Sequence, residues 1–389
     1  MASNSFINRT AAKNILDMCK WYPVVSVSGP RQSGKSTLLR HIFPDYEYIN
    51  LEDARTRQRA ISDPVSFIDN RKGKTIIDEA QHAPEIFSQI QARVDESQDK
   101  GQFIISGSQN FLLLKNIKQS LAGRVGIVKL LPLSYTEIRN ANIMQSTTEM
   151  LFNGGYPGLY AGNMPHNIFF DNYINTYAIR DITELISPGN VGSFKNFMEI
   201  CALHASNLIN LSNIAQKADI SRQTCKSWIN YLETSYIAFE LRPYFTNRIK
   251  TLTKTPKLYF YDTGLLVNLL GINTAEELAE SEYLGMVFEN YIISETVKMH
   301  YNNLASPRLY FYRDDSKLEA DLLDLTCRGK FTMSEIKASR TFRQMFTTQL
   351  KTINGKLPIT IDKLQVIMQS DESFKYKDIK ITSLDDYFC

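Results

Sequence analysis

The sequence contains the octapeptide Gly29-Pro-Arg-Gln-Ser-Gly-Lys-Ser36, which satisfies the pattern GxxxxGK(S/T). It lies between an apolar run at 24–28, which predicts a strand, and residues 35–42, which predict a helix. The glycines let the backbone curl around one phosphate group, and the N-terminus of the helix adds partial positive charge. We expect Lys35 to reach the β- and γ-phosphates of a nucleotide and Ser36 to offer its hydroxyl group to Mg²⁺. The residues predicted to contact the nucleotide are Gly29, Pro30, Arg31, Gln32, Ser33, Gly34, Lys35, Ser36 and Thr37.

An acidic pair follows this loop, as ATP hydrolysis requires. Residues 75–78 predict a strand that ends in Asp78 and Glu79, and one other predicted strand, 46–51, separates it from the loop. Asp78 is expected to hold Mg²⁺ through water, and Glu79 is expected to orient or deprotonate the attacking water. The guanine-reading motif NKxD does not follow the loop, and this favours ATP over GTP.

Two further residues could sense the γ-phosphate. Ser108 follows the predicted strand 103–106 and would lie between the acidic pair and the γ-phosphate, with Gln109 as the second choice. The alternative for Ser108 is a helix N-cap without a catalytic role. Arg124 precedes the predicted strand 125–130 and could approach the γ-phosphate of its own chain or of a neighbouring copy. The alternative for Arg124 is an ordinary surface cation.

Short apolar runs alternate with amphipathic ones in the first part of the chain, which predicts a parallel sheet in an α/β domain. The turn-rich segment 153–165 breaks this rhythm, and predicted helices follow it as far as about residue 236. Two predicted strands come next, at 237–245 and 257–261, before a C-terminal part that mixes helices and strands. We predict three domains in the 389-residue chain, at 1–150, 151–269 and 270–389.

A helix-turn-helix is predicted at 211–232, in the middle domain. The stretch that follows it, 242–257, contains five basic and no acidic residues and fits a wing that runs along phosphates. Modules of this kind can also be lids or protein-contact surfaces, and a basic stretch can be a solvated hairpin. The residues predicted to contact nucleic acid are Arg222, Gln223, Lys226, Arg242, Arg248 and Lys250.

Acidic residues recur on neighbouring elements of the C-terminal domain. Glu289 flanks the apolar stripe of a predicted helix, Asp321 begins a predicted strand, and Glu335 and Lys337 share one face of the next strand. The two strands are expected to form a hairpin that brings Asp321 beside Glu335. This order resembles the core of the PD-(D/E)xK nuclease superfamily, which has a restriction-endonuclease-like α/β fold. The resemblance implies that Asp321, Glu335 and Glu289 bind Mg²⁺, and that Lys337 positions or activates the attacking water.

Several motifs together resemble the bacterial and archaeal AAA-type ATPases that carry a C-terminal domain of unknown function. They are the octapeptide, Ile76-Ile-Asp-Glu-Ala-Gln81, Ile105-Ser-Gly-Ser108, Leu121-Ala-Gly-Arg-Val125, Leu131-Pro-Leu-Ser134, Gly154-Gly-Tyr-Pro157 and Tyr177-Ala-Ile-Arg-Asp-Ile182. The resemblance covers nearly the whole chain. It implies an AAA/ASCE P-loop ATPase core, then a helical and winged-helix module, then a nuclease-like domain. It also makes Arg180 a second candidate for sensing the nucleotide.

Composition narrows the class of protein. The 44 basic and 41 acidic side chains leave a net charge of only +3, which excludes a globally cationic nucleic-acid coat but allows a local basic patch. No apolar run approaches membrane-spanning length, and the polar first residues do not resemble a signal peptide. The five cysteines are scattered and odd in number, so neither a disulfide framework nor a zinc site is expected. We predict a cytoplasmic protein without a membrane partner.

The three sets of motifs along the chain together predict an ATPase that uses ATP and Mg²⁺. Its nucleotide state is expected to control a winged-helix and nuclease-like module that acts on nucleic acid. DNA is favoured over RNA. The alternative is a nucleotide-switched scaffold or regulator with an inactive nuclease-like domain. A third interpretation is a transcription regulator whose helix-turn-helix reads a specific site. The sequence leaves a homo-oligomer open, because Arg124 or Arg180 could complete the site of a neighbouring copy.

Overall fold

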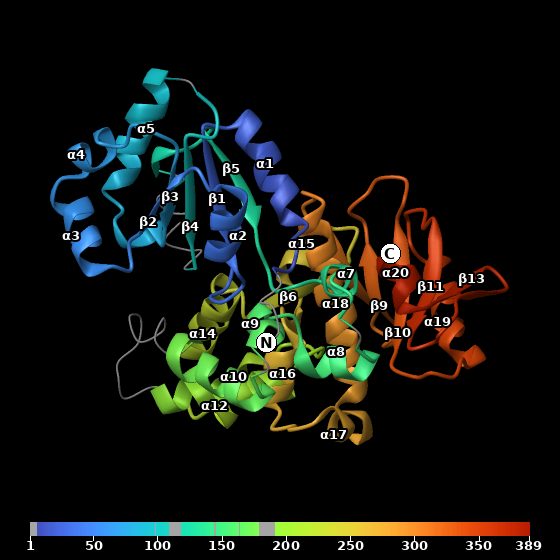
Figure 1. Cartoon of the computed structure of the whole chain (residues 1–389). Helices are drawn as coiled ribbons and strands as arrows, with labels where there is room; N and C mark the ends of the chain where they lie inside the picture. The colour runs from blue at the N-terminus through green and yellow to red at the C-terminus, as the bar shows by residue number, and fades with distance from the viewer. Residues whose placement is uncertain are drawn as a thin grey trace. The chain divides into compact units, whose positions relative to one another are not determined.

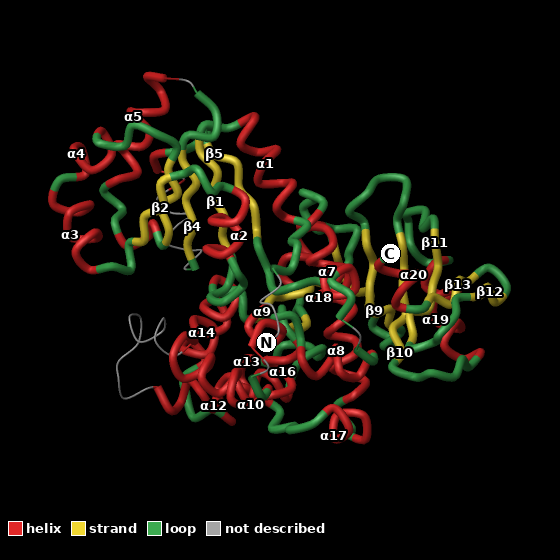
Figure 2. The backbone as a smooth tube through the Cα atoms, in the orientation of Figure 1, coloured by secondary structure: helices red, strands yellow, loops and turns green. Residues whose placement is uncertain are grey.

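The computed structural model describes residues 6–97, 99–108, 117, 119–143, 145–162, 164–178 and 191–389. The chain divides into two compact units, each with its own sheet (Figures 1 and 2). The first unit comprises Met1–Leu133 and two short later segments, Thr234–Tyr236 and Asn302–Leu304, and the second unit comprises the rest. The division into three domains is finer than this and stays a prediction.

The first unit is built on a parallel sheet that, within the described residues, has five strands in the order β2-β3-β4-β1-β5. Its strands are β1 (Val24–Ser28), β2 (Glu47–Asn50), β3 (Thr75–Asp78), β4 (Phe103–Gly107) and β5 (Val125–Lys129). Its helices are α1 (Ala11–Trp21), α2 (Lys35–Ile42), α3 (Ala54–Ser62), α4 (Pro64–Asp69), the 3₁₀ turn η1 (Ala80–His82) and α5 (Ile86–Ser97). The predicted α/β core with a parallel sheet is confirmed.

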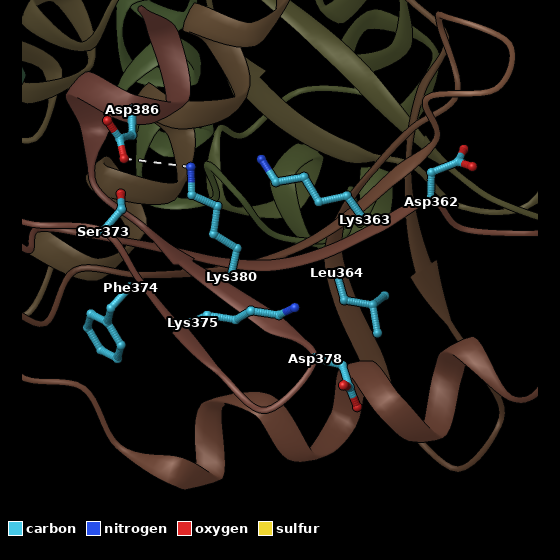
Figure 3. Close-up of a pocket in the computed structure, with 9 residues that line it drawn as sticks. All are labelled: Asp362, Lys363, Leu364, Ser373, Phe374, Lys375, Asp378, Lys380 and Asp386. Carbon is cyan, nitrogen blue, oxygen red and sulfur yellow. Dashed lines mark ion pairs between the residues drawn. The ribbon is translucent and has the colours of Figure 1, made fainter.

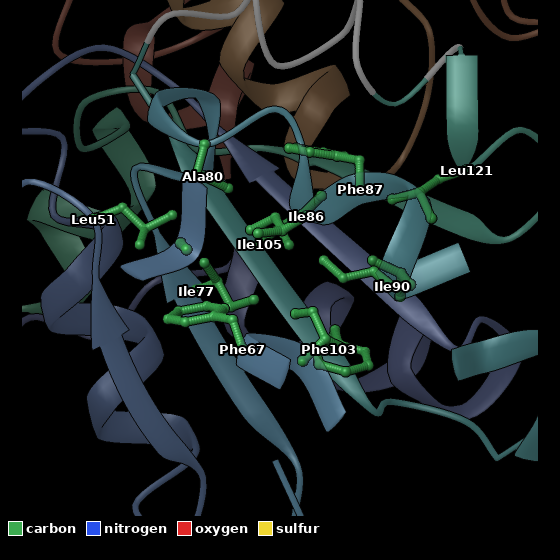
Figure 4. Packing of buried hydrophobic residues seen from close by; sticks show 14 of the residues in the cluster. Leu51, Phe67, Ile77, Ala80, Ile86, Phe87, Ile90, Phe103, Ile105 and Leu121 are labelled. Atoms are coloured by element: carbon green, nitrogen blue, oxygen red, sulfur yellow. The ribbon is translucent and has the colours of Figure 1, made fainter. Parts of the chain in front are cut away.

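Helices cover both faces of this sheet, which explains why its central strands are continuous apolar runs. Every residue of β1 and β4 is buried. On one face, Ile77 of β3 and Ile105 of β4 pack with α4 and α5 (Figure 4). On the other face, Ile76 and Ile104 pack with α1 and α2. Neighbouring residues of a strand point to opposite faces. Each of the pairs Ile76-Ile77 and Ile104-Ile105 therefore contributes one side chain to the hydrophobic core on either face of the sheet.

The strand order determines which loops meet. Strand β1 lies between β4 and β5, and β4 lies between β1 and β3. The carboxyl ends of parallel strands share one edge of the sheet, and ligands of open α/β sheets bind at that edge. The loop after β1 and the residues that end β3 and β4 therefore gather at one place.

The second unit contains a mixed sheet that, among the described residues, has eight strands in the order β12-β13-β11-β10-β9-β8-β6-β7. Its strands are β6 (Ala238–Pro243), β7 (Lys257–Phe260), β8 (Leu309–Arg313), β9 (Glu319–Asp324), β10 (Thr332–Lys337), β11 (Lys363–Met368), β12 (Phe374–Tyr376) and β13 (Ile379–Thr382). Its earlier helices are α7 (Tyr135–Asn140), α8 (Thr147–Asn153), α9 (Pro157–Gly162), α10 (His166–Tyr173), the π-helical turn η2 (Ile174–Ala178), α12 (Val191–Leu203), α13 (Leu211–Lys217) and α14 (Arg222–Thr234). Its later helices are α15 (Arg248–Thr253), α16 (Thr263–Leu269), α17 (Ala275–Glu280), α18 (Leu284–Asn302), η4 (Gln344–Thr347), α19 (Thr348–Asn354) and α20 (Leu384–Phe388).

Two parts of the second unit bear on the sequence-based expectations. Strands β9 and β10 form an antiparallel pair whose register aligns Ser334 with Leu322, so that Asp321 and Glu335 occupy the next positions. Strands β6 and β7 are also antiparallel. Between them the basic stretch forms helix α15 rather than an extended wing, because the side chain of Asn247 caps the helix by accepting a hydrogen bond from the backbone N–H of Ile249 at 2.9 Å.

Candidate functional site

The phosphate-binding loop connects the buried strand β1 to helix α2. Gly34, directly before α2, has φ 89°, a left-handed conformation that glycine adopts without steric cost. At Gly29, a Cβ atom would lie 2.0 Å from the carbonyl oxygen of Leu130, so a larger residue does not fit. The backbone itself therefore requires both glycines of the motif.

Lys35 opens helix α2 and turns its ammonium group back onto the loop. Its Nζ donates hydrogen bonds to the carbonyl oxygens of Gly29, at 3.0 Å, and Pro30, at 2.9 Å. The residue is only 5% exposed. Because a charge interaction is stronger where water is excluded, this buried ammonium group is well suited to attract a phosphate group.

Ser36 and Asp78 bring α2 and the end of β3 into direct contact. The Ser36 hydroxyl donates to Oδ2 of Asp78 at 2.5 Å, and the hydroxyl of Tyr48 on β2 donates to the same oxygen at 2.5 Å. Ser106 of β4 donates to the other carboxylate oxygen, Oδ1. Burial and the hydrogen bond to Asp78 raise the pKa of Tyr48, which therefore remains a donor. These hydroxyl and carboxylate oxygens fit Mg²⁺, which Ser36 and Asp78 would hold and which would supply positive charge beside the phosphates.

The sequence analysis gave no role to Tyr48 or to Ser106. Both reach Asp78 because β2 and β4 flank β3 in the sheet. The available signal for Ser106 is a polar residue in an otherwise apolar buried strand, at the end that faces the acidic pair. Tyr48 carries no comparable signal, because tyrosine is common in strands for reasons of packing.

Glu79 has a constrained backbone and a crowded carboxylate. Its φ is 54°, in the left-handed region that residues other than glycine adopt only when the surrounding structure holds them there. Its Oε2 accepts hydrogen bonds from Gln81 Nε2 at 2.5 Å, from the Ser108 hydroxyl at 3.0 Å and from the Ser108 backbone N–H at 3.2 Å. Ser108, directly after β4, thus contacts Glu79, and Gln81 is a further partner to which the sequence analysis gave no role.

Replacing Ser108 with alanine is expected to lower kcat for ATP about tenfold and leave KM nearly unchanged. The variant loses a hydrogen bond to a charged group, worth about 1.5–3 kcal/mol, but keeps the backbone N–H contact to Glu79. Steady-state phosphate release checks this. Ser62→Ala, which removes an exposed hydroxyl from α3, is the control. An unchanged kcat in Ser108→Ala would leave Ser108 with a capping role alone.

Of the two predicted arginine sensors, Arg124 lies in the described part of the chain, where it contacts a residue of its own unit. Arg124 forms a forked ion pair with Asp95 of α5, with distances of 2.5 Å from Nε to Oδ1 and 2.8 Å from Nη2 to Oδ2. This contact lowers the pKa of the Asp95 carboxyl below its usual value. Arg180 and the second-choice sensor Gln109 lie outside the described residues.

Exposed polar residues gather at the start of helix α14 in the second unit. Ser221 caps this helix by accepting a hydrogen bond from the backbone N–H of Thr224 at 3.0 Å. Arg222, Gln223 and Lys226 are exposed, whereas the opposite side of the helix is buried.

The other residues predicted to meet nucleic acid lie on or near α15. Arg242 of β6 donates to the carbonyl oxygen of Leu252 at 2.9 Å and pairs with Glu240 at 3.0 Å. Arg248 begins α15, and Lys250 on the same helix is exposed. Arg242 thus already contacts Glu240 of its own strand and the backbone of α15.

A cluster of carboxylates and lysines occupies the region where α18, β7, β9 and β10 meet. Lys337 pairs with Glu335 at 2.6 Å on β10, and Oδ2 of Asp321 on β9 accepts a hydrogen bond from the backbone N–H of Ile336 at 2.7 Å. Lys257 of β7 lies 3.2 Å from Glu289 of α18. We call Glu289, Glu319, Asp321, Glu335, Lys257 and Lys337 the carboxylate cluster.

Burial and mutual repulsion govern the acids of this cluster. Burial, reinforced by the charge of Asp321, raises the pKa of Glu289 to about 7 and that of Glu335 to about 7. Burial also raises the pKa of Asp321. In the part of the chain that the structure describes, no three His, Cys, Asp or Glu side chains form a group that could hold a metal ion.

Lys257 was read from the sequence as part of the basic stretch, but it is 4% exposed and lies among carboxylates. The signal that could have separated it from its neighbours is its place at the start of the predicted strand 257–261. Glu319 and Tyr259, which complete its surroundings, were not singled out either.

A pocket of about 460 Å³ is lined by β11, β12 and β13 and the segments beside them (Figure 3). Lys380 pairs there with Asp386 at 3.6 Å, and Asp362 accepts a hydrogen bond from the backbone N–H of Phe331 at 2.7 Å. Three lysines and three aspartates line it, so its charges balance. It contains none of the residues predicted from the sequence.

Comparison with known protein families gives three matches along the chain. Residues 22–139 match a family described as AAA domain. Residues 144–276 and 284–387 match two families, each described as a domain of unknown function (DUF8612 and DUF4143).

Similar proteins come from bacteria and archaea. An uncharacterized protein of Mycobacterium tuberculosis is 29% identical over 321 residues, which cover 81% of this chain and 70% of that protein. An uncharacterized protein of Methanocaldococcus jannaschii is 23% identical over 382 residues, or 90% of this chain and 82% of that protein. Among solved structures, the Walker-type ATPase of Pyrococcus abyssi is similar with a TM-score of 0.45 and 17% identity, covering 69% of this chain and 97% of that one.

No helix in the described ranges combines the length and the apolar character needed to cross a membrane. The family match at 22–139 coincides with the parallel sheet, the phosphate-binding loop and the acidic pair. This part of the chain is therefore an AAA-type P-loop ATPase domain.

Proposed function

We propose that the chain binds ATP with Mg²⁺ at the phosphate-binding loop, hydrolyses it, and uses the nucleotide state to control the second unit on nucleic acid. One observation carries the first part of the proposal: Ser36, Asp78, Glu79 and Ser108 converge at the carboxyl edge of the sheet. Phosphoryl transfer to water needs this combination of a phosphate cradle, a metal site and a group that orients water.

Each residue of this site has a distinct role in the proposal. Lys35 binds the β- and γ-phosphates after exchanging its two carbonyl partners for phosphate oxygens. Glu79 orients the attacking water and accepts its proton, and Ser108 holds the Glu79 carboxylate in position. The test is phosphate release from ATP by the full chain with Mg²⁺ and with excess EDTA. Turnover must depend on Mg²⁺, and equal rates in both conditions would contradict the proposal.

The topology around α13 and α14 supports a nucleic-acid module. Ala205 bridges to Leu258 and Leu208 bridges to Lys257, so the segment before α13 joins the antiparallel pair β6–β7. Helices α12, α13 and α14 beside an antiparallel pair of strands are typical of a winged helix, whose last helix enters a major groove. The exposed Arg222, Gln223 and Lys226 lie at the start of that helix.

The double variant Arg222→Ala/Lys226→Ala is expected to weaken binding of duplex DNA about tenfold and to reduce the slope of log K against log salt by about 2. Each lysine or arginine that contacts a phosphate releases counterions, so its removal flattens the salt dependence. Fluorescence anisotropy with labelled DNA and RNA at several salt concentrations measures both quantities. Lys20→Ala, which removes an exposed cation from α1, is the control. Wild-type binding without salt dependence would exclude phosphate contacts.

A second candidate function is a nucleotide-switched regulator whose C-terminal part binds without cleaving. It is favoured by the ion pairs of Lys257 and Lys337, which already engage the acids of the carboxylate cluster. Incubation of DNA and RNA with Mg²⁺ or Mn²⁺ separates the two functions. Cleavage that Asp321→Ala abolishes supports a nuclease, cleavage that survives it comes from another site, and binding without cleavage supports the regulator.

A further inference from the structure

Arg9 is a buried cation of the first unit, just before helix α1. It is 7% exposed. Its Nη1 donates a hydrogen bond to the carbonyl oxygen of Ser33 in the phosphate-binding loop at 2.7 Å, and its Nη2 donates to the carbonyl oxygen of Leu131, shortly after β5, at 2.6 Å. This arginine belongs to none of the motifs in the sequence. One forked side chain thus joins the loop to the segment that follows β5.

The segment after β5 also contacts the start of the loop. The backbone N–H of Leu130 donates to the carbonyl oxygen of Ser28 at 2.7 Å. At Gly29, the carbonyl oxygen of Leu130 leaves no room for a Cβ atom. The same segment is tied through Arg9 to Ser33, near the end of the loop. The phosphate-binding loop is therefore held at both ends.

The carbonyl group that Arg9 holds belongs to the peptide group between Ser33 and Gly34. In a trans peptide the C=O and the N–H point in opposite directions, so the contact also fixes the direction of the Gly34 N–H. Gly34 has φ 89°, and glycine adopts positive and negative φ about equally well, so this residue alone would let the peptide group turn over. A turned peptide would present a carbonyl oxygen to the phosphates in place of an N–H group, and the two would repel each other.

Two other carbonyl groups of the loop are held in a different way. The carbonyl oxygens of Gly29 and Pro30 accept from Lys35, which exchanges them for phosphate oxygens in the proposed function. Arg9 lies outside the motif, and the proposed function does not require it to release Ser33. The contact between Arg9 and Ser33 can therefore persist while ATP is bound.

We propose that Arg9 is a positioning residue for the phosphate-binding loop, because its guanidinium group holds the Ser33 carbonyl and so keeps the Gly34 N–H available to the phosphates. The inference rests on the proposed binding and hydrolysis of ATP at this loop, and it adds a residue outside the motif that sets the affinity for ATP. A loop that is ordered before ATP arrives costs less to order on binding. Since the loop contacts the phosphates before and during the reaction, loss of Arg9 weakens ATP binding more than it slows the chemical step.

Steady-state hydrolysis of ATP by the full chain with Mg²⁺ tests this role through separate values of KM and kcat, and calorimetric titration with a non-hydrolysable ATP analogue measures affinity directly. We expect Arg9→Ala to raise KM and Kd about tenfold, because two hydrogen bonds from a charged group are lost, and to leave kcat within about twofold of the wild type. Arg9→Lys keeps the charge but not the forked geometry, so its values should lie between the two. Arg71→Ala, which removes an arginine that contacts Phe67 and Glu47 in the same unit, should retain the wild-type values.

A purely structural role for Arg9 gives a different pattern. Partial unfolding lowers the fraction of active protein, and with it the apparent kcat, but leaves KM unchanged, and this result would overturn the inference. If Arg9→Ala does not fold, Arg9→Lys decides the question, since wild-type KM and Kd in that variant would show that the forked contact does not set the affinity. Absence of Mg²⁺-dependent turnover in the wild type would instead overturn the proposed function, and this inference with it.

Discussion

Replacing Glu79 with glutamine is expected to lower ATP turnover by about 100-fold or more while ATP binding is retained. Glutamine has nearly the shape of glutamate and can still meet Ser108, but it cannot accept a proton from water. General-base catalysis by a positioned side chain contributes about 10²–10⁴ to a rate. The left-handed backbone of Glu79 is unaffected by the exchange, so the effect should appear in kcat and not in the free energy of unfolding.

Single-turnover phosphate release measures the chemical step, and titration with a fluorescent ATP analogue measures binding. Glu85→Gln is a matched control, because Glu85 is an exposed acid shortly after the same strand. A Glu79→Gln variant with near-normal turnover would contradict the assignment of the catalytic base. A variant that loses binding as well would indicate that Glu79 contributes to the shape of the nucleotide site.

The sequence predicted the ATPase core well, because this core depends on the backbone and burial preferences of residues that are close together in the sequence. The glycines of the loop are required at fixed backbone positions, and the buried parallel strands are continuous apolar runs. The pairing of β9 with β10 was also accessible, since alternation along two adjacent strands places Asp321 near Glu335.

The side chains that contact the acidic residues could not be predicted from the sequence in this way. Asp78 meets Tyr48 only because β2 lies beside β3, and strand order is a property of the whole sheet. The partners of Lys257 were even harder to predict from the sequence. In the sequence it is one cation of a basic stretch. Its place at the start of a predicted strand sets it apart, but its partners Glu319 and Glu289 come from elements that are remote in the sequence.

Arg124 shows a third limit of prediction from the sequence. Arg124 was weighed as a sensor of the γ-phosphate and as a surface cation, and its forked contact with Asp95 accounts for it within its own unit. The choice between these roles depends on a residue of α5 that is remote in sequence. The role of Arg124 in catalysis thus stays a prediction, which Arg124→Ala and the ATPase assay address directly.

The second large effect is expected for Lys35→Ala, which should reduce both ATP affinity and turnover by about 100-fold. Lys35 is the buried cation of the loop, and losing one preorganised group that stabilises developing negative charge costs about 10²–10³ in rate. Its removal also leaves the carbonyl oxygens of Gly29 and Pro30 without this donor, so thermal unfolding of the variant must be compared with that of the wild type. Lys20→Ala, which removes an exposed cation from α1 of the same unit, should retain activity.

Lys35→Arg separates charge from shape in this prediction. The guanidinium group keeps the charge, but it is planar, larger and unable to act as a compact point charge in a site where lysine is only 5% exposed. We therefore expect Lys35→Arg to be impaired nearly as strongly as Lys35→Ala, with the loss mainly in kcat. If arginine restored full turnover, charge alone would explain the role of Lys35, and the tight fold of its ammonium group against Gly29 and Pro30 would have no part in catalysis.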